Sequence, residues 1–254
     1  MSDSTDNIGK RVRNFRETKG LTQQELELAI GLSFGHLSRI ESGKLNPTKE
    51  TLLKISQALK LDPRQQSYLF NTVDQPATQE EYEKVFQYVH HFVESSRHAM
   101  GISDVCGFIW YMNKEMQKLY GVDESMRQDF LRKIQGIHLL EWLYNPDTLG
   151  YKTIENESRK NLLLYQTLLF IYLINYFERK DETWLKALVE RLQRFSDFVK
   201  VWNTAIKKAE SNTPLSQKQL TMRFVVDGEI KGFNCNNTHI NKFPRFLVSE
   251  FIPA

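Results

Sequence analysis

Two short amphipathic segments of this chain are separated by only two residues, and this spacing limits how the region around them can fold. The segments cover residues 22–30 and 33–42. Thr22 and Glu25 form the pattern of a capping box, which predicts that the first helix begins there. Ser33 stands where the N-cap of the second helix is expected. Such a pair is typical of a helix-turn-helix, in which a short turn holds two helices at a steep angle.

Further helices are predicted on both sides of this pair, so that residues 8–73 form five short helices. Glycines end the first three helices and small polar residues cap the last two: Gly20, Gly31, Gly43, Thr48 and Asp62, the last followed by Pro63. Residues 1–7 are polar and are expected to fray. The segment 74–79 has the composition of a linker and marks the domain boundary.

The second helix of the pair has two different faces. At about 100° per residue, Leu37 and Ile40 project toward a core. The opposite side is mostly small and polar around one arginine, and it carries Phe34, Gly35, Ser38, Arg39 and Ser42. A helix lying in the major groove of DNA can have such a face.

Residues 8–60 resemble the Cro/cI-type (XRE) helix-turn-helix family of phage and bacterial repressors. The matching residues are Leu21-Thr22-Gln23, Glu25-Leu26, Gly31-Leu32-Ser33, Leu37-Ser38-Arg39-Ile40-Glu41, Gly43-Lys44, Pro47 and the segment 52–59. The resemblance implies a five-helix, lambda-repressor-like domain that binds double-stranded DNA. The DNA-binding residues that it implies are Gln23, Ser33, Phe34, Gly35, Ser38, Arg39 and Lys44.

The chemistry of these residues suits that role. Gln23 and Lys44 would meet phosphates, and the free amides at a helix N-terminus explain the place of Gln23. Arg39 can pair with guanine and Phe34 can touch a thymine methyl group. The alternative for Arg39 is a solvated charge or an ion pair with Glu41.

Two residues depart from the family pattern. Glu27 stands where the family commonly has a small alanine between the two helices, so we expect it to tilt into water or to loosen the helix pair. Gly35 offers no side chain and is expected to weaken its helix by about 1 kcal/mol relative to alanine.

The sequence predicts three parts: a DNA-binding domain at 1–75, a linker and long helix at 76–104, and a sensor domain at 105–254. Residues 80–100 are expected to form one helix with Val85, Val89 and Phe92 on a stripe. That stripe could form a homodimer, which a regulator needs in order to bind two half-sites, or could pack within its own domain.

The third part is predicted to be an α+β domain, which makes the chain mostly α with a smaller antiparallel sheet. Strands are expected at 105–112, 220–226, 229–233 and 245–252, with helices at 114–119 and across 124–209. Asn113 would cap the helix after the first strand, and Asp227-Gly228 predicts a type I′ hairpin. The uncharged stretch 161–177 is expected to be a buried helix rather than a membrane span.

Residues 105–122 are similar to the opening of a PAS-type domain, with a strand, an asparagine cap and a helix. With 138–140, 142–146, 191–202 and the end of the last strand, the region resembles the MmyB-like ligand-binding domain of bacterial regulators. The resemblance implies a PAS-like fold and a lipophilic, fatty-acid-like ligand. The candidate pocket residues are Phe108, Trp110, Met112, Leu163, Leu168, Phe170 and Ile171, although such a stripe is more often plain core.

Other function classes find little support. The net charge is only +3, and the two cysteines, Cys106 and Cys235, fit a reducing cytoplasm. Phosphate-loop, dinucleotide, zinc-protease and hydrolase motifs do not occur, so we expect no enzyme, cofactor or metal site. The expected protein is a cytoplasmic regulator without a membrane segment. A C-terminal domain that binds a peptide or a protein partner is the main alternative to a small-molecule sensor.

Overall fold

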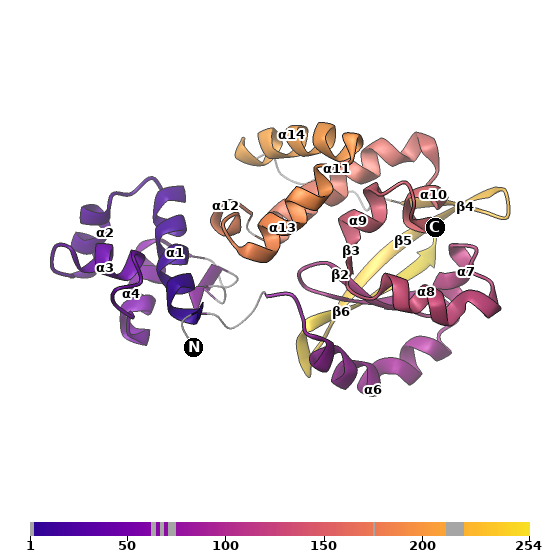
Figure 1. Cartoon of the computed structure of the whole chain (residues 1–254), viewed down its shortest axis with the longest axis horizontal. Helices are drawn as coiled ribbons and strands as arrows, with labels where there is room; N and C mark the ends of the chain where they lie inside the picture. Colours follow the sequence, from indigo (N-terminus) through magenta and orange to yellow (C-terminus); the bar gives the residue numbers. More distant parts are fainter. Residues whose placement is uncertain (1–2, 62–64, 67–68, 71–74, 175, 212–220) are drawn as a thin grey trace. The chain divides into compact units, whose positions relative to one another are not determined.

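The computed structural model describes the chain except for residues 1–2, 62–64, 67–68, 71–74, 175 and 212–220. The chain divides into two compact units (Figure 1). The first contains residues 1–74 and 174–186, and the second contains residues 75–173 and 187–254.

The first unit is a small helical domain. Its helices are α1 (Asp3–Thr18), α2 (Gln23–Ile30), α3 (His36–Glu41), α4 (Lys49–Ala58) and the later α12 (Tyr176–Arg179). α1 begins before the predicted start at residue 8, and α3 begins three residues after the predicted cap at Ser33. The fifth predicted helix, including its caps Asp62 and Pro63, lies largely outside the described residues. The core contains Val12, Phe15, Leu26, Leu37, Ile40 and Ile55, each with almost no exposed surface.

Local signals place these helices. Thr22 and Glu25 form the predicted capping box at the start of α2, and Thr48 caps α4. Gly31 ends α2 with φ +72°, a left-handed conformation that favours glycine. Gly9 is needed for close packing, because a Cβ at this position would lie 2.2 Å from the carbonyl oxygen of Ile40. Only a glycine therefore allows α1 to pack this closely on the end of α3.

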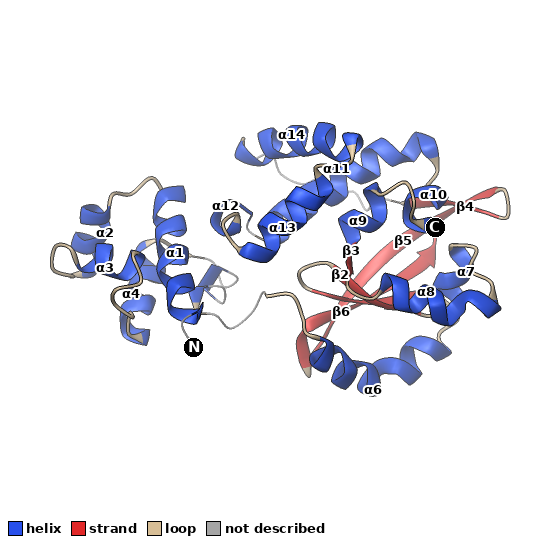
Figure 2. Cartoon of the chain, viewed as in Figure 1, coloured by secondary structure: helices blue, strands red, loops and turns tan. Residues whose placement is uncertain are grey.

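The second unit contains one antiparallel sheet with the strand order β3-β2-β1-β6-β5-β4 (Figure 2). The strands are β1 (Ala99–Asp104), β2 (Phe108–Met112), β3 (Ile137–His138), β4 (Met222–Val226), β5 (Glu229–Ile240) and β6 (Phe243–Pro253). The helices after residue 75, α12 apart, are α6 (Gln79–Ser95), α7 (Lys114–Leu119), η1 (Glu124–Met126), α8 (Arg127–Ile134), α9 (Leu139–Tyr144), α10 (Leu149–Thr153), α11 (Asn156–Leu173), α13 (Thr183–Leu192) and α14 (Ser196–Glu210).

The predicted mixture of helices and a smaller antiparallel sheet is confirmed. Asn113 caps α7, and Asp227 and Gly228 both have positive φ (54° and 78°), as a type I′ hairpin requires. The predicted helix at 80–100 was too long, because the chain leaves it at Ser96 and begins β1 at Ala99. None of the described helices is long and apolar enough to cross a membrane.

The helix α6 covers one face of the sheet. Tyr82, Val85, Val89 and Val93 pack with Met100, Ile102, Trp110, Phe246 and Val248 of the strands. The apolar stripe of α6 is therefore used within its own unit. The prediction that Phe92 belongs to this stripe was wrong, because Val93 takes that place; Phe92 and Tyr88 lie on another side of the helix and are 62% and 59% exposed.

A buried carboxylate attaches the beginning of the second unit to its sheet. Asp104 Oδ1 accepts hydrogen bonds from the backbone N–H groups of Cys106 and Phe108, at 3.0 and 2.9 Å. Its Oδ2 accepts the N–H of Ala77 at 2.9 Å and the indole N–H of Trp110 at 3.4 Å. Burial raises the pKa of the Asp104 carboxyl. The strand β2 begins at residue 108 rather than 105 because the turn around Asp104 comes first.

His138 begins α9 and is almost completely buried. Its Nε2 lies 2.9 Å from the carbonyl oxygen of Cys106, and its Nδ1 accepts the N–H of Leu140 at 3.1 Å. These two partners fit the neutral ring with the proton on Nε2. Burial lowers the pKa of His138 to about 4.

This histidine should make the second unit sensitive to acid. Its folded pKa of about 4 lies below the usual 6.5, so the unfolded chain binds the proton more tightly. Neutral His138 contributes its full share to the free energy of unfolding above pH 6.5. As the pH falls from 6.5 toward 4, the free energy of unfolding should decrease by about 3 kcal/mol. Urea unfolding, followed by tryptophan fluorescence at several pH values, measures how the free energy of unfolding depends on pH. His138→Gln should be less stable at pH 7 but vary less between these limits, and an unchanged pH dependence would contradict this role.

Candidate nucleic-acid interface and ligand pocket

A buried glutamate joins the two helices of the helix-turn-helix. Glu27 on α2 is only 1% exposed, and its Oε1 accepts the backbone N–H of Leu37 at 2.7 Å. Gly35, the N-cap of α3, has no side chain that could accept one of the free N–H groups of that helix. Glu27 supplies the missing acceptor from the neighbouring helix. The expectation that it tilts into water or loosens the pair was wrong, because a carboxylate is a good acceptor for free helix amides.

A second buried glutamate connects three helices. The carboxylate of Glu41, at the end of α3, accepts from Arg16 Nε at 2.6 Å and Nη2 at 2.9 Å. It also accepts from Gln23 Nε2, at the start of α2, at 2.7 Å. Hydrogen bonding to Glu41 raises the pKa of Arg16, whose Nη1 also donates to the carbonyl of Leu21. Glu41 therefore fixes α1, α2 and α3 relative to one another.

The face of α3 that points away from this core is open. Leu37 and Ile40 are buried as predicted, whereas Ser38 and Arg39 are exposed and Phe34 is 77% exposed. No ion pair or side-chain hydrogen bond joins the Arg39 guanidinium to any residue that the structure describes. Since Glu41 is taken by Arg16 and Gln23, the alternative of an Arg39–Glu41 pair finds no support.

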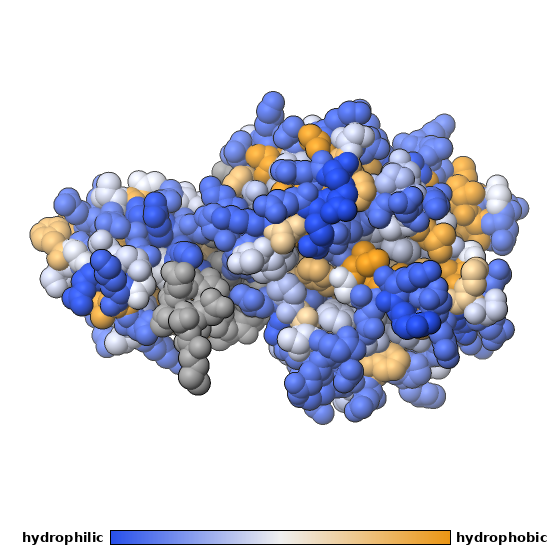
Figure 3. Space-filling view, in the orientation of Figure 1, coloured by the Kyte–Doolittle hydropathy of each residue, from blue (hydrophilic) through white to orange (hydrophobic). Residues whose placement is uncertain are grey.

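The remaining predicted residues lie around this face. Ser33 and Lys44 are exposed, and Gln23 is half-buried because its amide bonds to Glu41. Gly35 has φ +80° and precedes the helix, so it does not weaken α3 as expected; the backbone needs a glycine there. The surface of this unit visible in Figure 3 is mainly hydrophilic with small hydrophobic spots. We call the exposed set of Phe34, Ser38, Arg39 and Lys44 the α3 face.

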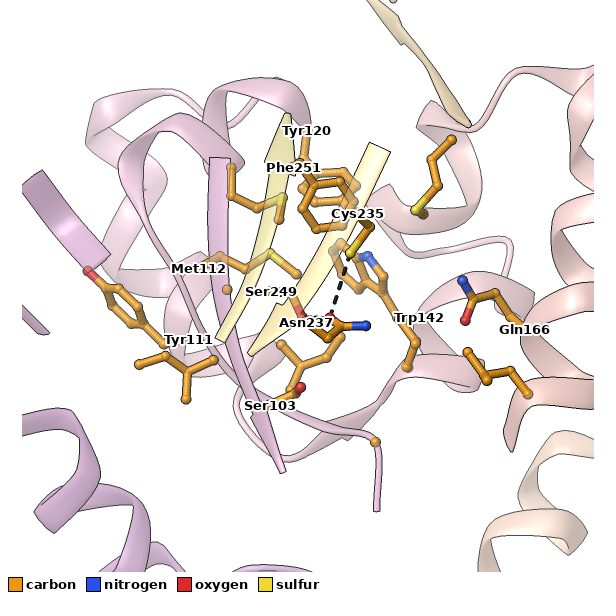
Figure 4. A pocket seen from close by; sticks show the side chains of 18 of the residues that line it. Ser103, Tyr111, Met112, Tyr120, Trp142, Gln166, Cys235, Asn237, Ser249 and Phe251 are labelled. Atoms are coloured by element: carbon orange, nitrogen blue, oxygen red, sulfur yellow. Dashed lines mark hydrogen bonds between the residues drawn. The ribbon is translucent and has the colours of Figure 1, made fainter. Parts of the chain in front are cut away.

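The second unit contains a pocket of about 200 Å³ on the face of the sheet opposite α6 (Figure 4). It is lined by residues of β1, β2, β4, β5 and β6 and by α7, α9 and α11. Met112 is the one residue of the predicted set that lines it. Leu163, Phe170 and Ile171 are buried elsewhere in the core, with Phe170 against the ring of His138 at 4.8 Å; Phe108 and Leu168 are half-buried.

A bulge in β2 explains why Trp110 is absent from the pocket. Tyr111 pairs with Ile102 and Ile109 pairs with Ser103, so Trp110 is an extra residue in the ladder. Trp110 and Tyr111 then both face α6, where they contact Tyr82 and Phe86 with ring centroids 5.1 and 5.0 Å apart. The prediction assumed that the side chains of Phe108, Trp110 and Met112 alternate regularly along the strand, and a bulge breaks this alternation. Tyr120, Trp142 and the residues of β5 and β6 also line the pocket, and nothing local in the sequence indicates that they converge.

Comparison with known proteins identifies the first unit. A helix-turn-helix family profile matches residues 12–66. The uncharacterized HTH-type transcriptional regulator y4dJ of Sinorhizobium fredii is 44% identical over 52 residues, which cover 20% of this chain and 68% of that protein. The regulator y4dL of the same organism is 34% identical over 62 residues, 24% of this chain and 32% of that protein. The ImmF control region 10 kDa protein of Bacillus phage phi105 is 36% identical over 55 residues, 22% of this chain and 61% of that protein.

The buried acceptor at Glu27 can be tested directly. Glu27→Ala leaves the N–H of Leu37 buried without a partner and should lower the local stability by about 1–3 kcal/mol. Glu27→Gln keeps an acceptor oxygen and should lose less. Native-state hydrogen exchange at the Leu37 amide measures both changes. Glu50→Ala is the control, since it removes only an exposed i,i+4 pair with Lys54. Equal losses in Glu27→Ala and Glu50→Ala would contradict the interpretation.

Proposed function

This chain belongs to the helix-turn-helix transcriptional regulators, and on that premise we propose that it binds operator DNA sequence-specifically through the α3 face. The observation that carries the proposal is the exposed guanidinium of Arg39, unpaired among the described residues, on a helix that buried hydrogen bonds hold in place. Arg39 would donate two hydrogen bonds to a guanine, and Phe34 would contact a thymine methyl group. Both side chains are free to do so because the residues of α3 that face the core are Leu37, Ile40 and Glu41.

The proposed phosphate contacts come from residues next to α3 and at the start of α2. Lys44 comes just after α3 and is exposed, so its ammonium can reach the DNA backbone. Gln23 is the first residue of α2, and its hydrogen bond to Glu41 orients the amide beside the free N–H groups of that helix. Because Gln23 is held in advance, little side-chain entropy is lost when a phosphate binds there.

We also propose that the protein acts as a homodimer, since one such domain binds only one half-site. Tyr82, Val85, Val89 and Val93 of α6 cannot serve this purpose, because they pack on the sheet of their own unit. Tyr88 and Phe92 lie one helical turn apart and remain exposed. A second copy of the chain could cover them, with the same surface used on both subunits.

The second unit is proposed to be a PAS-like, MmyB-like sensor of a small apolar ligand. The observed β2, the cap at Asn113 and α7 support the resemblance on which this rests. The pocket lies on the face of the sheet that α6 does not cover. On β1 of the same sheet, the Asp104 carboxylate accepts the backbone N–H of Ala77. Arg245 also donates to the carbonyls of Gln75 and Pro76. A ligand that shifts β1 would therefore act on the first residues after the DNA-binding unit.

Arg39→Ala tests the DNA contact. The operator is first selected from random duplexes with the wild-type protein. Arg39→Ala should then lose about 1–3 kcal/mol on the selected duplex and little on random DNA, because guanine recognition is lost while phosphate contacts remain. Fluorescence anisotropy over a salt series measures both. Lys44→Ala is the matched control, which should weaken all sequences alike and reduce the salt dependence by about one ion. An equal loss on both duplexes for Arg39→Ala would mean that it contacts only phosphate.

Phe92→Glu tests the dimer. A charge on this exposed position should shift the protein to monomer in sedimentation experiments and weaken operator binding, with little effect on unfolding. Val199→Glu changes another exposed apolar residue, on α14, and should leave the dimer intact. A dimer that persists in Phe92→Glu would place the interface elsewhere.

A further inference from the structure

The pocket of the second unit is large enough for one substituted ring. A closed apolar cavity of about 150 Å³ holds benzene, so a space of about 200 Å³ suits roughly ten non-hydrogen atoms. Its walls include the side chains of Met112, Met116 and Met222 and three aromatic rings, Tyr120, Trp142 and Phe251. Thioether sulfurs are polarisable and contact aromatic rings favourably. The walls therefore fit a flat aromatic molecule better than a long extended chain.

The lining carries no charged side chain among the residues that the structure describes: no lysine, arginine, histidine, aspartate or glutamate contributes to it. A carboxylate placed there would lose its hydration without gaining a counter-charge, which is costly. An ammonium group would meet the same difficulty. The ligand chemistry that fits is neutral, which differs from the fatty acid that the family resemblance implies.

The amide of Asn237 presents a donor to the pocket. Asn237 Oδ1 lies 2.7 Å from the Ser249 hydroxyl and 3.7 Å from the Cys235 sulfur, so the acceptor of this amide is already used. Its Nδ2 has no hydrogen-bond partner in the part of the chain that is described. Figure 4 shows the amides of Asn237, from β5, and Gln166, from α11, extending toward the same space.

The indole of Trp142 contributes only its ring to this wall. Its N–H is buried against Gly150, where a Cβ would lie 2.3 Å from Nε1, so a ligand in the pocket does not reach it. The Asn237 side chain is exposed, and water meets its Nδ2 until a ligand replaces that water. The acceptor atom that suits the uncharged lining is a neutral one.

We propose that this pocket binds a neutral aromatic molecule of about ten non-hydrogen atoms whose polar end is a carbonyl oxygen, held by the Asn237 amide. This rests on the sensor role proposed above and names the ligand class of the same site. The apolar ring lies among the methionine and aromatic side chains, and the carbonyl accepts from Nδ2 of Asn237. Recognition then depends on the acceptor and not on charge.

Three probes of nine non-hydrogen atoms separate these properties: acetophenone has the carbonyl, benzoate replaces it with a charge, and cumene has neither. Binding to the full-length protein is measured by calorimetry or ligand-observed NMR. Acetophenone should bind best, with cumene and benzoate weaker by about tenfold or more. Asn237→Leu should bring acetophenone to the level of cumene. The matched control is Asn236→Leu, at the neighbouring exposed position outside the pocket lining, which should keep the preference.

Met112→Trp fills the pocket and should abolish the binding of all three probes. Benzoate binding as tightly as acetophenone, or an acetophenone preference that survives Asn237→Leu, would overturn the ligand class while leaving a sensor pocket. If no probe binds the wild-type protein, or if Met112→Trp leaves binding unchanged, both the ligand class and the small-molecule sensor are overturned, and the second unit is then better explained as a module for a protein partner.

Discussion

The proposed DNA-binding surface, the α3 face, depends on two buried carboxylates of the helix-turn-helix, Glu27 and Glu41. Glu41 receives hydrogen bonds from α1 and α2, and Glu27 receives one from the start of α3. A buried charge is costly unless its oxygens are satisfied, so these contacts permit few other arrangements of the three helices. The position of Arg39 follows from this constraint, because its own helix is short and could not hold a side chain in register alone.

The second unit uses the same principle at Asp104. One buried carboxylate accepts four N–H groups, and these come from the beginning of the unit, from the turn before β2 and from the bulged Trp110. The bulge turns Trp110 and Tyr111 toward α6 and leaves Met112 on the pocket side. The fold of the sheet thus separates two apolar surfaces, one that is filled by a helix and one that is left open as a pocket.

Features that depend on neighbouring residues could largely be predicted from the sequence, whereas contacts between distant residues could not. The caps at Thr22, Thr48 and Asn113, the turn glycines and the Asp227-Gly228 hairpin act within a few residues, and these predictions are confirmed. The predicted cap at Ser33 was wrong, because α3 begins after Gly35. The partner of Glu27 is ten residues away, and its role depends on how two helices meet. The apolar residues of α11 are spread over all sides of the helix, so periodicity could not show which side faces the pocket. Gln166 and Leu169 line the pocket, whereas Leu163 and Phe170 are buried in the core. The bulge at Trp110 likewise has no signal in the sequence.

The α3 face, held by these carboxylates, is proposed to be the surface that binds DNA. Hydrogen-exchange mass spectrometry of the full-length protein, with and without a selected operator duplex, tests it most directly. Binding through the α3 face should protect peptides that cover residues 22–45, and peptides of β5 and β6 should change little. Protection confined to the sheet of the second unit, with residues 33–44 exchanging as in the free protein, would contradict the claim.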